Sequence, residues 1–112
     1  MRLPNAERAI IRPEKLRDYL LSPTHPMNRR KWAFFSSLGY TVSTWRALER
    51  ALREEHLALD VSEEKLTDWG VLYILAGPLT GRAGQRAVVR SVWIVRHGEE
   101  RPRFVTAYPA NE

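Results

Sequence analysis

The sequence predicts a single α+β domain in which about three N-terminal helices pack on an antiparallel meander sheet of three to four strands. Apolar residues recur at helical spacing in the first half of the chain, whereas the second half holds β-branched and aromatic runs. The intervals between those runs are too short for crossover helices, so neighbouring strands should pair antiparallel. With 112 residues, 44% of them hydrophobic, the chain can bury one core, and we expect one domain spanning residues 1–112.

The first half predicts three helices after a polar segment, residues 1–9, that is expected to fray. Pro13 suits the first position of a helix. Leu16, Tyr19 and Leu20 follow at i, i+3 and i+4, which places them on one face. A second helix is expected to begin after Asn28, as its N-cap, and to end at Gly39. The expected helices span residues of about 13–21, 29–38 and 44–56.

The third of these helices can be capped by Ser43 or Thr44, and apolar residues recur along it at helical spacing. His56, near its end, is expected to be solvated or to face the helix dipole. Residues 60–68 are acidic and show no clear period, so we interpret them as a loop with one helical turn at 62–66.

The second half predicts strands at residues of about 70–76, 87–96 and 103–108. The segment from Gly77-Pro78 to Gly84 is rich in glycine and is interpreted as a hairpin turn. Strict alternation along the last strand would place Phe104, Thr106 and Tyr108 on one face. Arg103, Val105 and Ala107 would then lie on the other.

Composition limits the compartment and the partners. The chain has no cysteine and no apolar run long enough to cross a membrane, so we expect a cytoplasmic protein without a membrane partner. Its net charge is +5, which favours polyanions such as RNA. Cations predominate in residues 1–43 and 69–112, and carboxylates in 44–68, so the fold can bring two basic segments together. The sequence makes no prediction of oligomeric state.

One stretch combines the features from which chemistry can come. Pro23 and Pro26 hold His25 on an extended loop. Three cations, residues 29–31, follow in the first turn of the second helix, where they oppose the helix dipole unless an anion offsets them. A purely structural interpretation also fits, with a linker followed by a core helix whose arginines are solvated.

Known catalytic motifs are absent. The chain has no phosphate loop, dinucleotide glycine pattern, HExxH or Gly-x-Ser-x-Gly elbow, and its three histidines lack ligand spacing, so no cofactor and no metal site are expected. The remaining groups suit RNA cleavage by the 2′-hydroxyl, which needs a base, a cation and a proton donor. The candidate catalytic residues are His25, Lys31, Thr106 and Tyr108. The candidate phosphate and RNA contacts are Arg29, Arg30, Arg82 and Arg103.

Several motifs together resemble a bacterial domain family of unknown function. They are Ser22-Pro23-x-His25-Pro26, Lys31, Phe34-Phe35, Leu38-Gly39-Tyr40, Leu79-Thr80-Gly81 and Pro102-Arg103-Phe104-Val105-Thr106-Ala107-Tyr108-Pro109. Asn28 departs from the pattern, because related sequences carry glycine there. The family occurs as short standalone proteins and, in related versions, as C-terminal modules of secreted polymorphic toxins. The resemblance therefore implies an antitoxin or immunity protein as a partner.

The order of helices and strands also resembles the barnase, EndoU, colicin and RelE-like group of metal-independent ribonucleases, an analogy at the level of fold. This analogy implies a site formed by His25, Lys31, Arg103, Thr106 and Tyr108.

Three functions stay open at this point. The first is a metal-independent endoribonuclease, which requires His25, Lys31 and Thr106 to converge on an open pocket. The second is a non-catalytic module that binds nucleic acid or an acidic protein. The third is a housekeeping subunit without a role in nucleic-acid binding.

Overall fold

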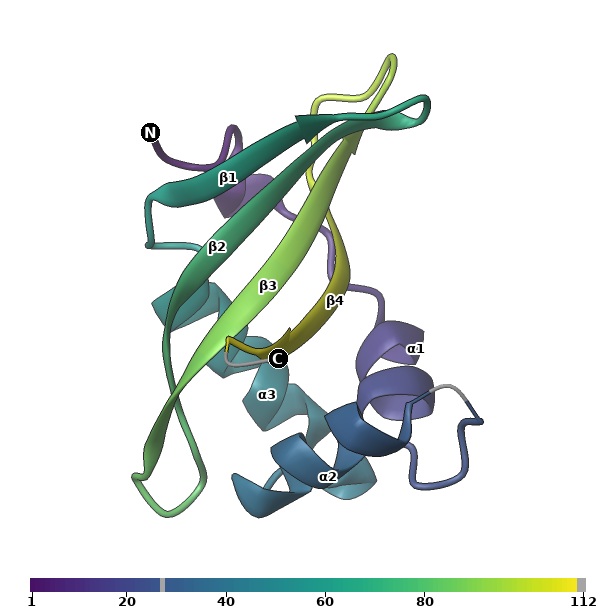
Figure 1. Cartoon of the computed structure of the whole chain (residues 1–112), viewed down its shortest axis with the longest axis vertical. Helices are drawn as coiled ribbons and strands as arrows, with labels where there is room; N and C mark the ends of the chain where they lie inside the picture. The colour runs from purple at the N-terminus through teal and green to yellow at the C-terminus, as the bar shows by residue number, and fades with distance from the viewer. Residues whose placement is uncertain (27, 111–112) are drawn as a thin grey trace.

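The structure, a computed structural model, describes residues 1–26 and 28–110. It contains three helices and one four-stranded antiparallel sheet (Figure 1). All helices precede all strands, and the strand order is β1-β2-β3-β4, so each strand pairs with its neighbour in the chain. The α+β class predicted from the sequence is thus confirmed, with four strands in the sheet.

Two of the three helices, the first and the third, are extended by a segment of different winding. Helix α1, Pro13–Lys15, continues into a π-helical segment, Leu16–Leu20. Helix α2 spans Arg29–Ser37. A 3₁₀ turn, Val42–Thr44, leads into α3, Trp45–Ala51, which continues as a second π-helical segment, Leu52–His56. Thr44, one of the two expected caps, occupies the N-cap position of α3 but makes no side-chain cap hydrogen bond there. Thr41 and Thr44 instead form a capping box at the start of the 3₁₀ turn.

The strands are β1, Val61–Leu66; β2, Gly70–Thr80; β3, Arg86–Arg96; and β4, Arg103–Pro109. The loop with one helical turn expected around residues 60–68 is wrong, because β1 occupies 61–66. Half of its side chains are charged and most are exposed, so the segment carries no apolar period, and pairing with β2 determines its structure.

Strand β2 continues through the segment that was interpreted as a turn. It passes Gly77 and Pro78 and ends at Thr80, with Pro78 opposite Val88. Strand β1 pairs with β2 only as far as Leu75, so β2 is an edge strand beyond that point. An edge strand tolerates proline because one side of its backbone needs no hydrogen bond.

Strand β4 contains a β-bulge that changes which residues share a face. Thr106 lies opposite Val92 and Phe104 lies opposite Trp93, so Val105 is an extra residue in the β3–β4 pairing. The alternation expected for the last strand is therefore wrong beyond Phe104.

The bulge sorts the β4 side chains onto two faces. Phe104 and Ala107 lie opposite the fully buried Trp93 and Ser91, and both point into the core. On the outer face of the sheet β4 instead presents three of the side chains selected from the sequence: Arg103, Thr106 and Tyr108.

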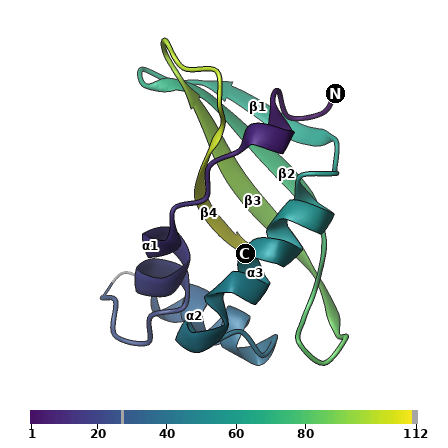
Figure 2. The ribbon, with the colours of Figure 1, turned by 180° about the vertical axis from the view of Figure 1, so that it is seen from behind.

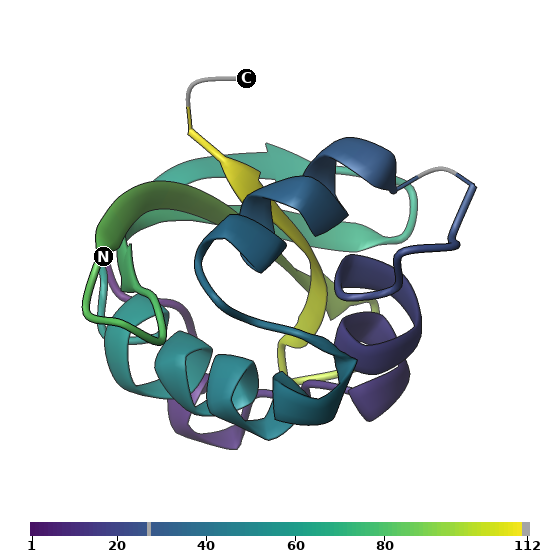
Figure 3. The same cartoon turned by 90° about the horizontal axis from the view of Figure 1, so that it is seen from below.

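The core lies between the helices and the inner face of the sheet. From behind, α3 lies across the sheet and α1 lies beside the end of β4 (Figure 2), and from below the strands and helices surround the core (Figure 3). Residues of both layers fill it, and their side chains are fully buried: Leu16, Leu20, Phe35, Leu48, Leu52, Leu75, Val89 and Trp93. These spacings on the first and third helices are those from which the helices were predicted.

The N-terminal segment, expected to fray, is instead fixed to the domain. Leu3 and Ala9 are buried in the core. The Val61 N–H donates a hydrogen bond of 2.6 Å to the Met1 carbonyl, and Arg53 donates one of 2.9 Å to the Ala9 carbonyl. Two buried apolar side chains and these hydrogen bonds to the backbone hold the segment, although it lacks an amphipathic period.

His56, expected to be solvated, is fully buried between α3 and the sheet. Its Nε2–H donates to the Gly77 carbonyl at 3.1 Å, and its Nδ1 accepts from the Ser91 hydroxyl at 2.7 Å. Ser91 Oγ also accepts from Trp93 Nε1–H at 2.9 Å. Since a carbonyl can only accept and an indole N–H can only donate, these partners assign the neutral Nε2–H tautomer.

Burial lowers the pKa of His56, and the hydrogen bond to Gly77 and the charge of Glu55 offset only part of this effect. In the unfolded chain His56 binds a proton as pH falls through ~6.5, whereas in the folded chain it binds this proton only at lower pH. Stability contributed by neutral His56 is complete above that pH and is lost as pH falls below it.

We therefore predict that the free energy of unfolding decreases when pH is lowered from about 7.5 to about 5.5, and that His56→Gln flattens this dependence. At pH ~7.5 the variant should lose ~1–3 kcal/mol, because buried partners of His56 lose their hydrogen bonds. Urea unfolding at both pH values measures this. The exposed His97→Gln is the matched control, and an equal pH dependence in His56→Gln and wild type would contradict the assignment.

Candidate active site

A cationic cluster joins three elements that are far apart in the sequence. Lys31 Nζ, from α2, donates to Tyr19 Oη at 2.7 Å and to Thr106 Oγ1, from β4, at 3.1 Å. The Thr106 hydroxyl lies 3.4 Å from Tyr19 Oη and can donate to it. All three residues are half-buried, so the cluster is reached by solvent. We call Lys31, Tyr19 and Thr106 the lysine cluster.

The ammonium group of Lys31 retains capacity for an anion. It has three N–H donors, of which two are used within the cluster. Among the described residues no carboxylate lies within ion-pair distance of Lys31, in contrast to Lys65, which pairs with Glu63 at 3.5 Å. A phosphate oxygen can therefore bind Lys31 without displacing a protein partner.

Asn28 fixes the start of α2 against the segment that carries Tyr19. It occupies the N-cap position, as predicted, but its side chain does not cap the helix. Instead its side-chain amide donates to the Tyr19 carbonyl, and the residue is buried. This contact holds Lys31, in the first turn of α2, within hydrogen-bonding distance of the Tyr19 hydroxyl.

His25 lies beside the cluster rather than in it. Its half-buried ring meets the Tyr19 ring edge-on, with the ring centroids 5.1 Å apart and an interplanar angle of 84°. The structure therefore brings three of the sequence-predicted catalytic residues, His25, Lys31 and Thr106, around one tyrosine that sequence reasoning did not select.

The surroundings of Tyr19 lower the pKa of its phenol. Burial raises its pKa, but the hydrogen bonds from Lys31 and Thr106 and the charges of Lys31 and Lys15 outweigh burial, so the pKa is lowered. The Lys31 ammonium also lies 5.2 Å from the centroid of the Tyr19 ring. A tyrosine with a lowered pKa can donate a proton more readily near neutral pH.

Tyr19 had a weak signal in the sequence. It lies at a position of the first helix where the apolar period predicts a buried side chain. A leucine would satisfy that period, whereas a tyrosine hydroxyl in a partly buried position needs a polar partner. The partners, Lys31 and Thr106, come from elements 12 and 87 residues away, which no local pattern reveals.

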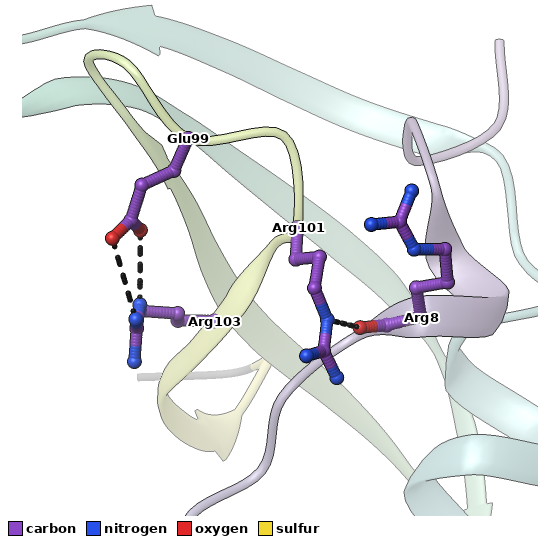
Figure 4. A network of polar contacts seen from close by, with 4 residues as sticks. All are labelled: Arg8, Glu99, Arg101 and Arg103. Atoms are coloured by element: carbon purple, nitrogen blue, oxygen red, sulfur yellow. Dashed lines mark hydrogen bonds and ion pairs between the residues drawn. The ribbon is translucent and has the colours of Figure 1, made fainter.

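Tyr108 and Arg103 share the outer face of β4 with Thr106 but do not join the cluster. Tyr108 is half-buried and lies opposite Arg90. Arg103 donates from Nε and Nη2 to Glu99 at 3.0 and 3.3 Å, and beside it Arg101 donates to the Arg8 carbonyl (Figure 4). The hydrogen bond to Glu99 raises the pKa of Arg103 and lowers that of Glu99.

The other predicted phosphate contacts lie at opposite ends of α2. Arg29 and Arg30 are exposed in its first turn, close along the chain to Lys31. Arg82 is exposed in the β2–β3 hairpin, and its N–H donates to the Leu38 carbonyl just after α2. A nine-residue helix is ~13 Å long, so Arg82 is separated from the lysine cluster by about that distance.

In the described part of the chain, no group of three or more His, Cys, Asp or Glu side chains lies close enough together to bind a metal ion. Among the same residues, no helix has the length and apolar character needed to cross a bilayer.

Fold and site together define a small α+β domain with a cationic, hydrogen-bonded cluster between its helices and its last strand. A family model, "Domain of unknown function (DUF6883)", matches residues 2–111, so the chain belongs to this family. No curated protein matches the chain.

A solved structure shares the fold. It is a chain of a contact-dependent growth inhibition toxin–immunity protein complex from Klebsiella pneumoniae 342, with a TM-score of 0.68 and 18% sequence identity. The similarity covers 96% of this chain and 97% of the other.

We predict that Lys31→Met raises the pKa of Tyr19, because the substitution removes both the charge and the main hydrogen bond that lower it. Carbon-13 NMR of labelled tyrosine rings measures the titration, and Tyr19→Phe assigns the signal among the four tyrosines. Lys65→Met, which removes an exposed lysine, should leave the titration unchanged. The same Tyr19 pKa in wild type and Lys31→Met would refute the electrostatic role given to Lys31.

Proposed function

We propose that this domain is a toxin-like endoribonuclease that cleaves RNA without a metal ion. The observation that carries the proposal is the lysine cluster, in which a half-buried ammonium group contacts a tyrosine of lowered pKa and keeps one N–H that no described residue accepts. Cleavage through the 2′-hydroxyl needs a cation for the developing phosphorane charge and groups that transfer two protons. The cluster and His25 supply these groups.

In the proposed reaction His25 accepts the proton of the 2′-hydroxyl as its oxygen attacks phosphorus. The P–O5′ bond breaks while the O2′–P bond forms, which yields a cyclic phosphate and a free 5′-hydroxyl. Tyr19 donates the proton that the leaving O5′ takes up, and Lys31 binds the non-bridging oxygen on which negative charge develops. Thr106 orients both the ammonium and the phenol. Solvent returns the proton from His25 to Tyr19.

The cations beyond the cluster then contact RNA outside the cleaved bond. Arg29 and Arg30 are exposed next to Lys31 and suit flanking phosphates. Tyr108, on the same face of β4 as Thr106, suits a contact with an adjacent nucleotide. Arg82 and Arg103 lie outside the immediate cluster, so their contribution to binding is expected to be smaller than that of Arg29 and Arg30.

The fold shared with a chain of a toxin–immunity protein complex supports the toxin-like part of the proposal. A toxin that degrades cellular RNA acts in the cytoplasm and needs an inhibitor in the cell that makes it. We therefore infer an immunity protein or antitoxin as a partner, with an acidic surface complementary to the +5 net charge.

A second function is favoured by one feature of the same cluster. The three residues of the lysine cluster form hydrogen bonds with one another. These bonds are also what a purely structural contact between α2 and β4 would need. The domain would then be a non-catalytic module that binds nucleic acid or an acidic protein through its exposed cations.

Cleavage of a mixed RNA pool in the presence of EDTA tests the proposal. We predict that Lys31→Met slows cleavage at least ~100-fold, as expected when a charge-stabilising donor is removed. His25→Gln and Tyr19→Phe should each slow cleavage ~100-fold or more, since each removes a proton-transfer group. The readout is the initial rate of 2′,3′-cyclic phosphate formation.

Lys65→Met is the control for removing a lysine, and it should cleave at the wild-type rate. The circular dichroism spectrum and urea midpoint of each variant separate loss of chemistry from loss of fold. Salt-sensitive RNA binding by the wild type without cleavage would favour the binding module. Wild-type rates in a folded Lys31→Met would exclude the lysine cluster as the catalytic site.

A further inference from the structure

A second candidate site lies between the α1 segment and the strands β3 and β4. It is a cavity of about 490 Å³, within the range of ~300–1,000 Å³ typical of small-ligand sites. Four cations and an indole contribute to its lining: Arg12, Lys15, Arg96, Arg103 and Trp69. Among the described residues no carboxylate lines it, and the proposed chemistry at Lys31 does not use it.

Trp69 lies exposed on a hydrogen-bonded turn between β1 and β2. Its side chain is 76% exposed, which leaves a large apolar surface in contact with water. The backbone N–H of Trp69 donates to Thr67 Oγ1 at 3.2 Å, and the backbone carbonyl of Trp69 accepts from the His97 N–H at 3.1 Å. The β1–β2 and β3–β4 hairpins thus hold each other side by side (Figures 1 and 2), and the indole is available as a flat platform.

The charge of the cavity is strongly positive. Arg103 is paired with Glu99 at its rim, which leaves three of the four cations without a carboxylate within ion-pair distance among the described residues. Arg12 and Arg96 are exposed and come from different elements, one from the segment before α1 and one from the end of β3. Such an arrangement favours an anion with a planar, stackable group.

Residues that line the cavity adjoin residues of the lysine cluster. Lys15 lines the cavity, and its Nζ lies 5.9 Å from the centroid of the Tyr19 ring. On β4, Val105 lines the cavity and the next residue, Thr106, binds Lys31. The bulge at Val105 places Arg103 and Thr106 on the same face, so a chain bound at one site can extend along β4 to the other.

We propose that this cavity binds a nucleotide of single-stranded RNA next to the cleaved phosphate, with its base stacked on Trp69 and its phosphate held by Arg12 and Arg96. This inference rests on the proposed function, because it assigns a subsite to the same substrate. Base stacking on an exposed indole beside arginines is a recurrent way to hold single strands without reading their sequence. An acidic peptide would match the charge but would leave the flat face of Trp69 without a specific partner.

Binding of short RNA tests the subsite without requiring catalysis. The probe is a fluorescent five-nucleotide RNA with 2′-O-methyl groups, which block attack by the 2′-oxygen, together with a version of the same RNA that carries abasic sites. Trp69→Ala should weaken binding of the intact probe ~10-fold and leave the abasic probe nearly unaffected. Trp69→Phe, which keeps an aromatic ring, should restore most of the loss.

Two matched controls isolate the named residues. Leu66→Ala truncates another exposed apolar side chain of the same hairpin, and Arg86→Gln removes a cation at the opposite end of β3 from Arg96. Arg96→Gln should weaken both probes and reduce the salt dependence of binding, whereas Leu66→Ala should change neither. Arg86→Gln should have a smaller effect than Arg96→Gln.

The outcomes separate this inference from the proposed function. Trp69-dependent probe binding by a domain that cleaves no RNA would support the subsite and contradict the ribonuclease. Lys31-dependent cleavage with equal probe affinity in wild type and Trp69→Ala would overturn the subsite alone. Equal losses for the intact and abasic probes, or displacement of the probe by an oligoglutamate peptide at lower concentration than by RNA, would also overturn it.

Discussion

The ammonium group of Lys31, held between the hydroxyl groups of Tyr19 and Thr106, is the interaction on which the proposed chemistry depends. A partly buried charge needs partners, and a lysine in the first turn of a helix also opposes the helix dipole. Two hydroxyl groups satisfy the ammonium without neutralising it, as a carboxylate would. The chain thereby keeps a positive charge at the junction of α2, the Tyr19 segment and β4. Asn28 donates to the backbone carbonyl of the same tyrosine and His25 meets its ring edge-on, so one residue is the common neighbour of the site.

A single extra residue in β4 determines what this junction faces. The bulge at Val105 turns Phe104 and Ala107 inward and leaves Arg103, Thr106 and Tyr108 on the outer face. Without it, regular alternation would place either the apolar or the polar members of this strand on the wrong side of the sheet. Thr106, which binds Lys31, and Arg103, which lines the basic cavity beside Trp69, therefore share one face of β4. Bulges commonly re-aim side chains next to active sites.

The sequence predicts the elements of this fold better than their contacts. Periodic apolar residues marked the three helices, and β-branched runs marked three of the four strands. Strand β1 has no such signal, because its charged side chains are exposed and its structure comes from pairing with β2. Lys31, His25 and Thr106 were selected by residue type, whereas Tyr19 was not, because its role depends on partners distant in sequence. The sequence predicts a solvated His56 for the same reason. Only the fold shows that Ser91 and Gly77, both distant in sequence, form hydrogen bonds with its two ring nitrogens.

The contact between RNA and the Lys31 ammonium can be observed directly by NMR. The sample is the wild-type domain with nitrogen-15 in its lysine side chains, titrated with an RNA whose 2′-oxygens are methylated. The Lys31 side-chain signal should shift saturably, with parallel shifts at Tyr19 and Thr106, and the midpoint should move to higher RNA concentration as salt is added. Saturable RNA binding that leaves the Lys31 signal unchanged while shifting signals elsewhere would contradict a phosphate site at the lysine cluster.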